Sequence, residues 1–173
     1  MKKNKIVEDL ALKLHCSEKL MPSPDDVIYD DEILKEIELI SDLEQVDRDG
    51  RTLLINAAAY ERVSIVQYLI GRGADVTAQD KMGFSSLHFA VQNANIELIK
   101  ILLDAGADIN QKNKFGNPPL MVANPVTHPE ELYKLLLSCG ADPNLQNNYG
   151  RSAKDLCGAY PKIMSILFPC TEA

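Results

Sequence analysis

The sequence predicts an all-α solenoid of stacked helix-turn-helix units, and three regularities indicate it. Glycines Gly50, Gly83 and Gly116 recur every 33 residues, and Gly150 follows after 34. Alanines Ala57, Ala90 and Ala123 keep the same 33-residue step. The tripeptide Gly-Ala-Asp begins at Gly73, Gly106 and Gly140. Self-similarity at a fixed period of this length is the sequence signature of repeat architectures.

Each unit has the same internal order, with a glycine turn, a short apolar segment and a second segment of helical spacing. In the second segments the apolar residues lie three and four positions apart, which marks one face of a helix. They are Val63, Val66, Leu69 and Ile70, then Ile96, Ile99, Leu102 and Leu103, then Leu132, Leu135 and Leu136. The glycine of each Gly-Ala-Asp follows such a helix, where a left-handed C-cap favours glycine. Short helix pairs bury their apolar faces only when copies stack, so the core should run through all units.

The second unit resembles a known repeat family. Its segment from Gly83 to Ala90, G-F-S-S-L-H-F-A, is similar to the ankyrin signature T-P-L-H-x-A, and Thr52–Ala57 and Pro118–Ala123 are weaker versions. The resemblance covers about Val46 to Phe168. It implies an ankyrin-repeat solenoid, with paired antiparallel helices and hairpin fingers projecting from one side.

Departures from the family pattern predict where the array is irregular. Only His88 keeps the signature histidine, which in the family ties neighbouring repeats by hydrogen bonds; Ile55, Met121 and Asp155 replace it. Pro125 and Pro129 should shorten the first helix of the third unit. The expected division is a helical N-terminal extension and cap (1–45), repeat 1 (46–80), repeat 2 (81–113), repeat 3 (114–147) and a C-terminal capping repeat (148–173).

Residues 1–45 lack the signature but contain two apolar stripes separated by a proline-containing break at Pro22–Asp26. We expect the second stripe to form the outer helix of a degenerate cap, with the first helix packing over or beside it. Acidic residues are dense between Asp25 and Asp49, and they form either a solvated helix face or a contact for a basic partner. The stripes consist of Ile6, Val7, Leu10, Ala11 and Leu14, and of Ile33, Leu34, Ile37, Ile40 and Leu43.

Composition narrows the functional classes. Hydrophobic residues make up 46% of the 173 residues, charged residues 25%, and the net charge is -7. This charge argues against nucleic-acid and anionic-membrane partners. The basic start of the chain is followed at once by Glu8 and Asp9, so no apolar signal core is expected and the cytoplasm is the predicted location. The cysteines Cys16, Cys139, Cys157 and Cys170 show no paired spacing, and we expect them to be reduced and mostly buried.

No residue pattern predicts catalysis. His15, His88 and His128 stand in unrelated contexts, and the sequence contains no zinc-ligand spacing, phosphate loop or nucleophile motif. We therefore expect a protein that is not an enzyme and that uses no cofactor and no metal.

Binding is expected on the fingers and the first helices, where the family usually meets its partners. The tip position before each glycine normally carries Asp or Asn, as Asp49 does, but the next three tips carry Met82, Phe115 and Tyr149. Aligned apolar groups there indicate an interface, although each could instead tuck against the neighbouring finger. The full set of predicted contacts is Arg48, Arg51, Tyr60, Lys81, Met82, Phe84, Gln92, Asn93, Lys114, Phe115, Asn117, Asn148, Tyr149, Arg151 and Tyr160.

The predicted function is that of a protein, monomeric when unbound, that binds one protein partner and inhibits or masks it. One recurring class of short ankyrin proteins is the bacterial immunity protein, which neutralises a cognate toxin, and the small acidic chain is compatible with it. The alternatives are a eukaryotic regulatory adaptor or kinase-inhibitor-like ankyrin protein, and a secreted effector that targets host proteins.

Overall fold

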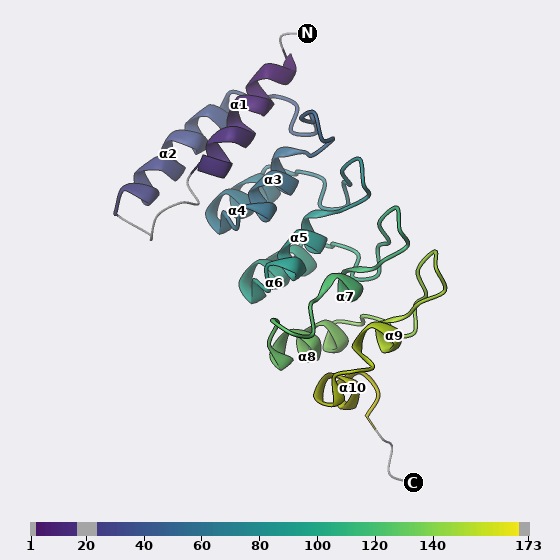
Figure 1. The fold of residues 1–173 in the computed structure, drawn as a ribbon. Helices are drawn as coiled ribbons and strands as arrows, with labels where there is room; N and C mark the ends of the chain where they lie inside the picture. The colour runs from purple at the N-terminus through teal and green to yellow at the C-terminus, as the bar shows by residue number, and fades with distance from the viewer. Residues whose placement is uncertain (1–2, 17–23, 170–173) are drawn as a thin grey trace.

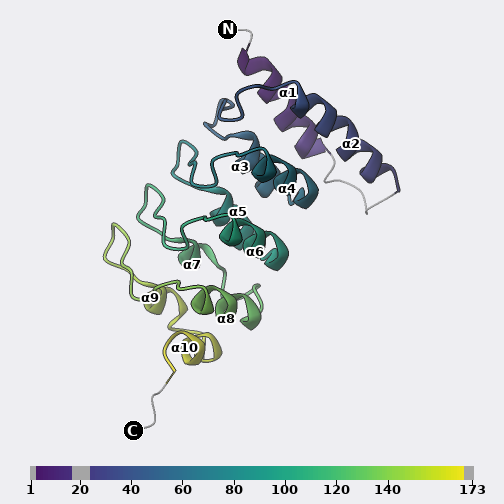
Figure 2. The same ribbon diagram turned by 180° about the vertical axis from the view of Figure 1, so that it is seen from behind.

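A computed structural model describes the backbone of residues 3–16 and 24–169 and the side chains of residues 6–14 and 31–169. Within that part of the chain, helical pairs stack along one direction, and hairpin fingers project from the same side of each joint (Figures 1 and 2). The predicted all-α solenoid is confirmed. The helices are α1 (Lys3–Cys16), α2 (Pro24–Glu38), α3 (Leu53–Ala59), α4 (Val63–Gly71), α5 (Ser86–Gln92), α6 (Ile96–Asp104), α7 (Pro119–Val122), α8 (Glu130–Ser138), α9 (Ala153–Cys157) and α10 (Pro161–Leu167).

The helices divide into an inner and an outer layer. The inner helices α3, α5, α7 and α9 lie beside the fingers, and the outer helices α4, α6, α8 and α10 lie behind them. Neighbouring inner helices contact one another, as do α3 with α4 and α5 with α6. Their buried leucines, isoleucines and alanines form one continuous cluster from Val7 to Leu167. Each repeat therefore contributes only one layer of the core. This is expected of repeats that are too small to fold alone and that bury their apolar faces by stacking.

Local capping explains where the inner helices begin. The Thr52 side chain accepts a hydrogen bond from the Ile55 N–H at 3.3 Å, and Ser152 forms a capping box with Asp155 at the start of α9. In the third repeat, proline occupies the N-cap and the first helical position, and α7 is only four residues long. The predicted shortening by proline is confirmed, since Pro125 cannot continue the helix.

The N-terminal helices form a complete layer of the stack. Helix α1 contacts α3 and helix α2 contacts α4, so α1 occupies an inner position and α2 an outer one. The expected outer position of the second helix is confirmed, and the first lies beside it. Val7, Leu10 and Leu14 are buried, but Ile6 is 53% exposed, so the apolar face of α1 is narrower than the sequence predicted.

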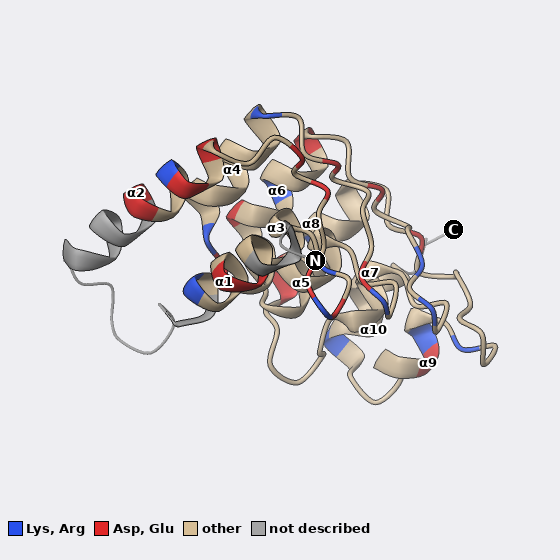
Figure 3. Ribbon diagram, turned by 90° about the horizontal axis from the view of Figure 1, so that it is seen from above, with Lys and Arg blue, Asp and Glu red and all other residues tan. Residues whose placement is uncertain are grey.

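Polar contacts fasten this N-terminal layer to the first repeat. Arg72, at the C-terminal end of α4, donates hydrogen bonds to the carbonyls of Ile37 and Ile40 at 3.3 and 3.1 Å. These bonds tie the last turn of α2 and the segment that follows it to α4; the Ile37 carbonyl also accepts the backbone N–H of Ile40 at 3.0 Å. Lys13 of α1 and Glu36 of α2 form an ion pair, and both helices carry basic as well as acidic residues in their described parts (Figure 3).

Cysteine placement corrects one expectation. Cys157 is buried in the core, but Cys139 is exposed at the end of α8, and both are free thiols. The side chains of Cys16 and Cys170, like that of His15, lie outside the described residues. No described helix is long and apolar enough to cross a membrane.

Candidate functional site

The four fingers share one turn geometry. Each begins with Asp or Asn, at Asp47, Asp80, Asn113 and Asn147, whose side-chain oxygen accepts the backbone N–H groups two and four residues later. These hydrogen bonds are 2.8–3.0 Å long. The side chain replaces partners that a tight turn would otherwise leave unpaired. Hydrogen bonds within each finger therefore stabilise its turn independently of its contacts with the neighbouring fingers.

Neighbouring fingers are joined through their backbones. The N–H of Lys81 donates to the carbonyl of Asp49, that of Lys114 to Met82, and that of Asn148 to Phe115, each at 3.0 Å. The glycine in each finger has a positive φ, between 69° and 79°. A Cβ on Gly83 would lie 2.6 Å from the Lys114 nitrogen. In the first three fingers glycine is thus required both by conformation and by close approach, which explains why Gly50, Gly83 and Gly116 recur every 33 residues.

The finger tips present a line of large apolar side chains, and we call Met82, Phe115 and Tyr149 the tip row. Their exposed fractions are 48%, 37% and 73%. The carbonyls of Met82 and Phe115 accept the hydrogen bonds that join the fingers, so the row has a fixed order with one member per repeat. Exposed apolar groups aligned on a rigid support are typical of interaction surfaces. Asp49, the tip of the first finger, ends the row on the N-terminal side.

Basic and amide side chains lie beside the tip row. Lys81 and Lys114, which directly precede Met82 and Phe115, are exposed, as is Arg151. The Lys81 ammonium donates to the Arg48 carbonyl, and the Asn148 amide donates to the Lys114 carbonyl at 2.8 Å. These contacts cross from one finger to the preceding one. The Lys81 and Asn148 side chains therefore support the row, and the exposed Lys81, Lys114 and Arg151 place positive charge along its edge.

Two residues predicted to contact a partner lie deeper in the molecule. Phe84 is half-buried, with its ring centroid 5.4 Å from that of His88 and 5.6 Å from that of Phe89. The Arg51 guanidinium lies 4.7 Å from the centroid of Phe89, and its Nε is 3.5 Å from a carboxylate oxygen of Asp80. Both side chains bind the first two fingers to α5, which leaves them at the base of the row and not in it.

The signature histidine joins two repeats, as the family resemblance implied. Its Nδ1 accepts the N–H of Ser85 at 3.2 Å, and its Nε2 lies 3.1 Å from the carbonyl of Asn117 in the next finger, to which it can donate. Burial lowers the pKa of His88, because desolvation penalises the charged ring. The neutral ring supplies the one acceptor and one donor that this position needs. Asn117, another predicted contact, also accepts a hydrogen bond from Asn147 at 2.8 Å.

The remaining predicted contacts lie on the inner-helix side. Gln92 and Asn93 are exposed at the end of α5, and the Asn93 amide donates to the Ala59 carbonyl at 3.0 Å. Tyr60 is half-buried and lines a pocket of about 250 Å³ with Arg48. Tyr160 lines a more open hollow of about 640 Å³ at the other end of the array.

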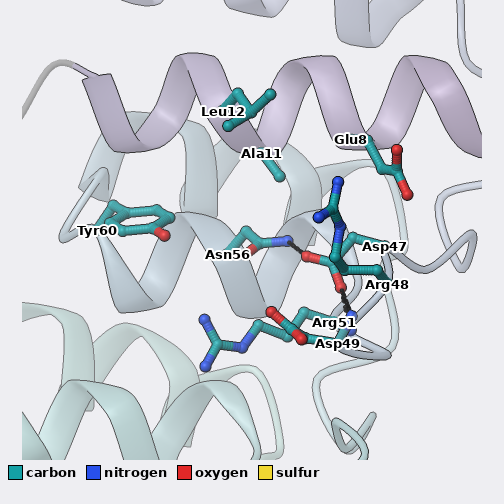
Figure 4. A pocket seen from close by; sticks show the side chains of 9 residues that line it. All are labelled: Glu8, Ala11, Leu12, Asp47, Arg48, Asp49, Arg51, Asn56 and Tyr60. Carbon is teal, nitrogen blue, oxygen red and sulfur yellow. Dashed lines mark hydrogen bonds between the residues drawn. The ribbon is translucent and has the colours of Figure 1, made fainter.

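Sequence reasoning missed the pocket at the N-terminal end. It lies between α1, the first finger and α3, and Arg48 extends from the finger toward α1 (Figure 4). Glu8 and Leu12 of α1 contribute to its lining. No sequence signal placed α1 beside α3, so no pattern could have named these residues. The hollow near Tyr160 likewise depends on Pro125 and Pro129, whose loop departs from the repeat pattern.

The described residues offer charge and apolar surface more than reactive groups. Among them, no three His, Cys, Asp or Glu side chains gather closely enough to hold a metal ion. Burial raises the pKa of the Cys157 thiol, which disfavours the nucleophilic thiolate. The arrangement is suited to holding another molecule against an extended surface.

Comparison with known proteins agrees with the repeat geometry. A family model of ankyrin repeats, with three copies, matches residues 27–113 and 87–147, which together span more than half of the chain. The match begins within α2, so it includes part of the N-terminal layer. No curated protein matches the chain.

Proposed function

Because the chain belongs to the ankyrin-repeat family, whose repeats generally mediate binding to other proteins, we propose that it binds one protein partner across the tip row. By occupying a surface of that partner, it masks or inhibits it. The exposed alignment of Met82, Phe115 and Tyr149 is the observation that carries this proposal.

The energetics favour the tip row over other exposed apolar residues. Leu39 and Val126 are 87% and 69% exposed, but Leu39 lies in the turn after α2 and Val126 in the loop between α7 and α8. The members of the row instead occupy equivalent positions in consecutive repeats. A large buried anchor at an interface centre typically contributes about 2 kcal/mol or more. The hydrogen bonds within and between fingers fix the backbone beforehand, which lowers the entropic cost of association.

A narrower form of the proposal is that the protein neutralises a toxin as a bacterial immunity protein. The net charge of -7 supports it, because many toxins that act on nucleic acid are basic and opposite charge speeds encounter. A eukaryotic regulatory adaptor, a kinase-inhibitor-like protein or a host-targeting effector would use the same surface. A toxin-like reading frame beside this gene would favour the immunity role, and introns in the gene would contradict it.

Affinity capture from the native source tests the proposal. Three immobilised proteins are compared: the wild type, a variant with Met82, Phe115 and Tyr149 changed to Asn, and a matched control. The control carries the same number of Asn substitutions at exposed positions of the outer helices, Gln67, Lys100 and Lys134. We expect one protein to be retained by the wild type and the control and lost from the tip-row variant. Equal retention by all three, with circular dichroism showing each folded, would contradict the proposal.

A further inference from the structure

The tip row has a fixed spacing, which restricts what can lie along it. Its members belong to consecutive stacked repeats, and the finger backbones are hydrogen-bonded in register. Stacked helices pack about 8–10 Å apart, so successive anchors are separated by about 8–10 Å as well. Seven residues of an α-helix advance about 10.5 Å. In a helix that lies along the fingers, residues seven positions apart therefore lie over successive anchors.

An extended strand fits this spacing less well. Successive residues on one face of a strand are about 7 Å apart. A strand that starts on Met82 therefore falls short of Phe115 and falls further short of Tyr149. A helix is also about 10–12 Å wide with its side chains. It can cover the tip row and the adjoining lysines together.

The positive charge beside the tip row favours acidic residues on the partner surface that covers it. Lys81 and Lys114 are exposed next to Met82 and Phe115, and Arg151 is exposed in the last finger. Asp80, the carboxylate that begins the second finger, is buried, and one of its oxygens lies 3.5 Å from the Arg51 Nε. Contacts within a Debye length of about 8–10 Å respond to these local cations more than to the net charge of the whole chain. Asp49 carries negative charge only at the N-terminal end of the row.

We infer that the tip row binds an acidic amphipathic helix of the partner, with apolar residues at every seventh position and Asp or Glu beside them. This inference rests on the proposed function and specifies its partner surface. The apolar residues cover Met82, Phe115 and Tyr149, and the carboxylates approach Lys81 and Lys114. Such an element can be a surface helix of a protein whose overall charge is basic.

Selection from a displayed library of randomised helical peptides, about 20 residues long, tests the inference. The full-length protein is the immobilised target, and the tip-row Asn variant is a parallel target. A third target is the double variant Lys81→Glu, Lys114→Glu, which keeps the apolar anchors. We expect the wild type to enrich acidic sequences with a seven-residue apolar period. Binding of those peptides to the charge variant should fall about tenfold at low salt and less at high salt.

Each outcome of the selection decides a separate point. Enrichment of basic sequences, of sequences with a two- or three-residue apolar period, or of no helical sequence would overturn the acidic-helix inference. Any such result leaves the proposed function standing if the captured partner still requires the tip row. Peptides that bind the tip-row Asn variant as tightly as the wild type would instead contradict the tip row as a binding site, and the proposed function with it.

Discussion

Replacing Gly83 by alanine should destabilise the protein far more than the same change at Gly150. Both glycines have a positive φ, +79° and +69°, so both changes incur left-handed strain of about 1–2 kcal/mol. Alanine also restricts the conformations of the unfolded chain, which offsets about 0.4–1 kcal/mol of this strain. The net loss in the free energy of unfolding is then near 1 kcal/mol. At Gly150 nothing lies within 4 Å of the new Cβ, so no further loss is expected.

At Gly83 the new methyl group must displace the third finger. Its Cβ would lie 2.6 Å from the Lys114 nitrogen and 3.0 Å from two backbone carbons of Asn113. Relieving that overlap costs about 1–3 kcal/mol, and losing the hydrogen bond from Lys114 to Met82 costs about 1 kcal/mol more. The expected total is about 3–5 kcal/mol, against about 1 kcal/mol for Gly150→Ala.

Urea unfolding followed by far-ultraviolet circular dichroism measures both free energies. Amide hydrogen exchange at Lys114 supplies an independent reading, because its N–H is the donor between the second and third fingers. Exchange there should accelerate in Gly83→Ala and stay unchanged in Gly150→Ala. Equal losses of stability in the two variants would refute the account of the fingers as a close-contact stack.

Three further changes test other joints of the array. Burial lowers the pKa of His88 in the folded protein, so as the pH falls the unfolded state binds a proton at this residue before the folded state does. The free energy of unfolding should therefore decrease as the pH drops below about 6.5 and should be constant above it. His88→Gln should flatten that dependence in pH-resolved thermal melts, and an unchanged slope would exclude His88 as its source. Tyr133→Phe should leave stability unchanged or raise it by about 1 kcal/mol, because the buried hydroxyl has no hydrogen-bond partner; a loss larger than that in urea unfolding would contradict this reading. Arg72→Met removes the donors to the Ile37 and Ile40 carbonyls and should cost about 1 kcal/mol with faster amide exchange in α2; unchanged exchange would show that these bonds do not hold the N-terminal layer.

The regular part of the fold could be predicted because its cause is local. A left-handed turn and a close backbone contact both demand glycine, so the finger spacing is visible as the period of Gly50, Gly83 and Gly116. The outer helices were equally visible, because their apolar faces follow helical spacing. A break in the pattern could also be predicted, because Pro125 limits the first helix of the third unit and α7 ends at Val122.

The candidate site could be predicted only in part, because contacts between repeats decide which apolar residue faces solvent. Met82 and Phe84 belong to the same finger, yet Met82 is 48% exposed while Phe84 packs against His88 and Phe89. Nothing in the residue types distinguishes them. The cation–π contact of Arg51 with Phe89 similarly joins residues of different repeats, and no sequence period records such a pairing.

The N-terminal layer was the hardest to predict. Its helices lack the signature, and an apolar stripe gives no sign of which neighbour it contacts. The placement of α1 against α3 depends on the fit of Val7, Leu10 and Leu14 to the rest of the core. The pocket lined by Glu8 and Arg48 follows from that placement alone.

Hydroxyl-radical footprinting of the complex with the captured partner shows whether that partner covers the tip row. Methionine, phenylalanine and tyrosine side chains react readily with the radical, so Met82, Phe115 and Tyr149 report their own exposure, while Leu39, 87% exposed and outside the row, serves as the internal control. If the partner binds across the tip row, modification of these three residues should fall several-fold in the complex, while modification of Leu39 should not change. Unchanged modification of all three in a complex shown to be intact would contradict it.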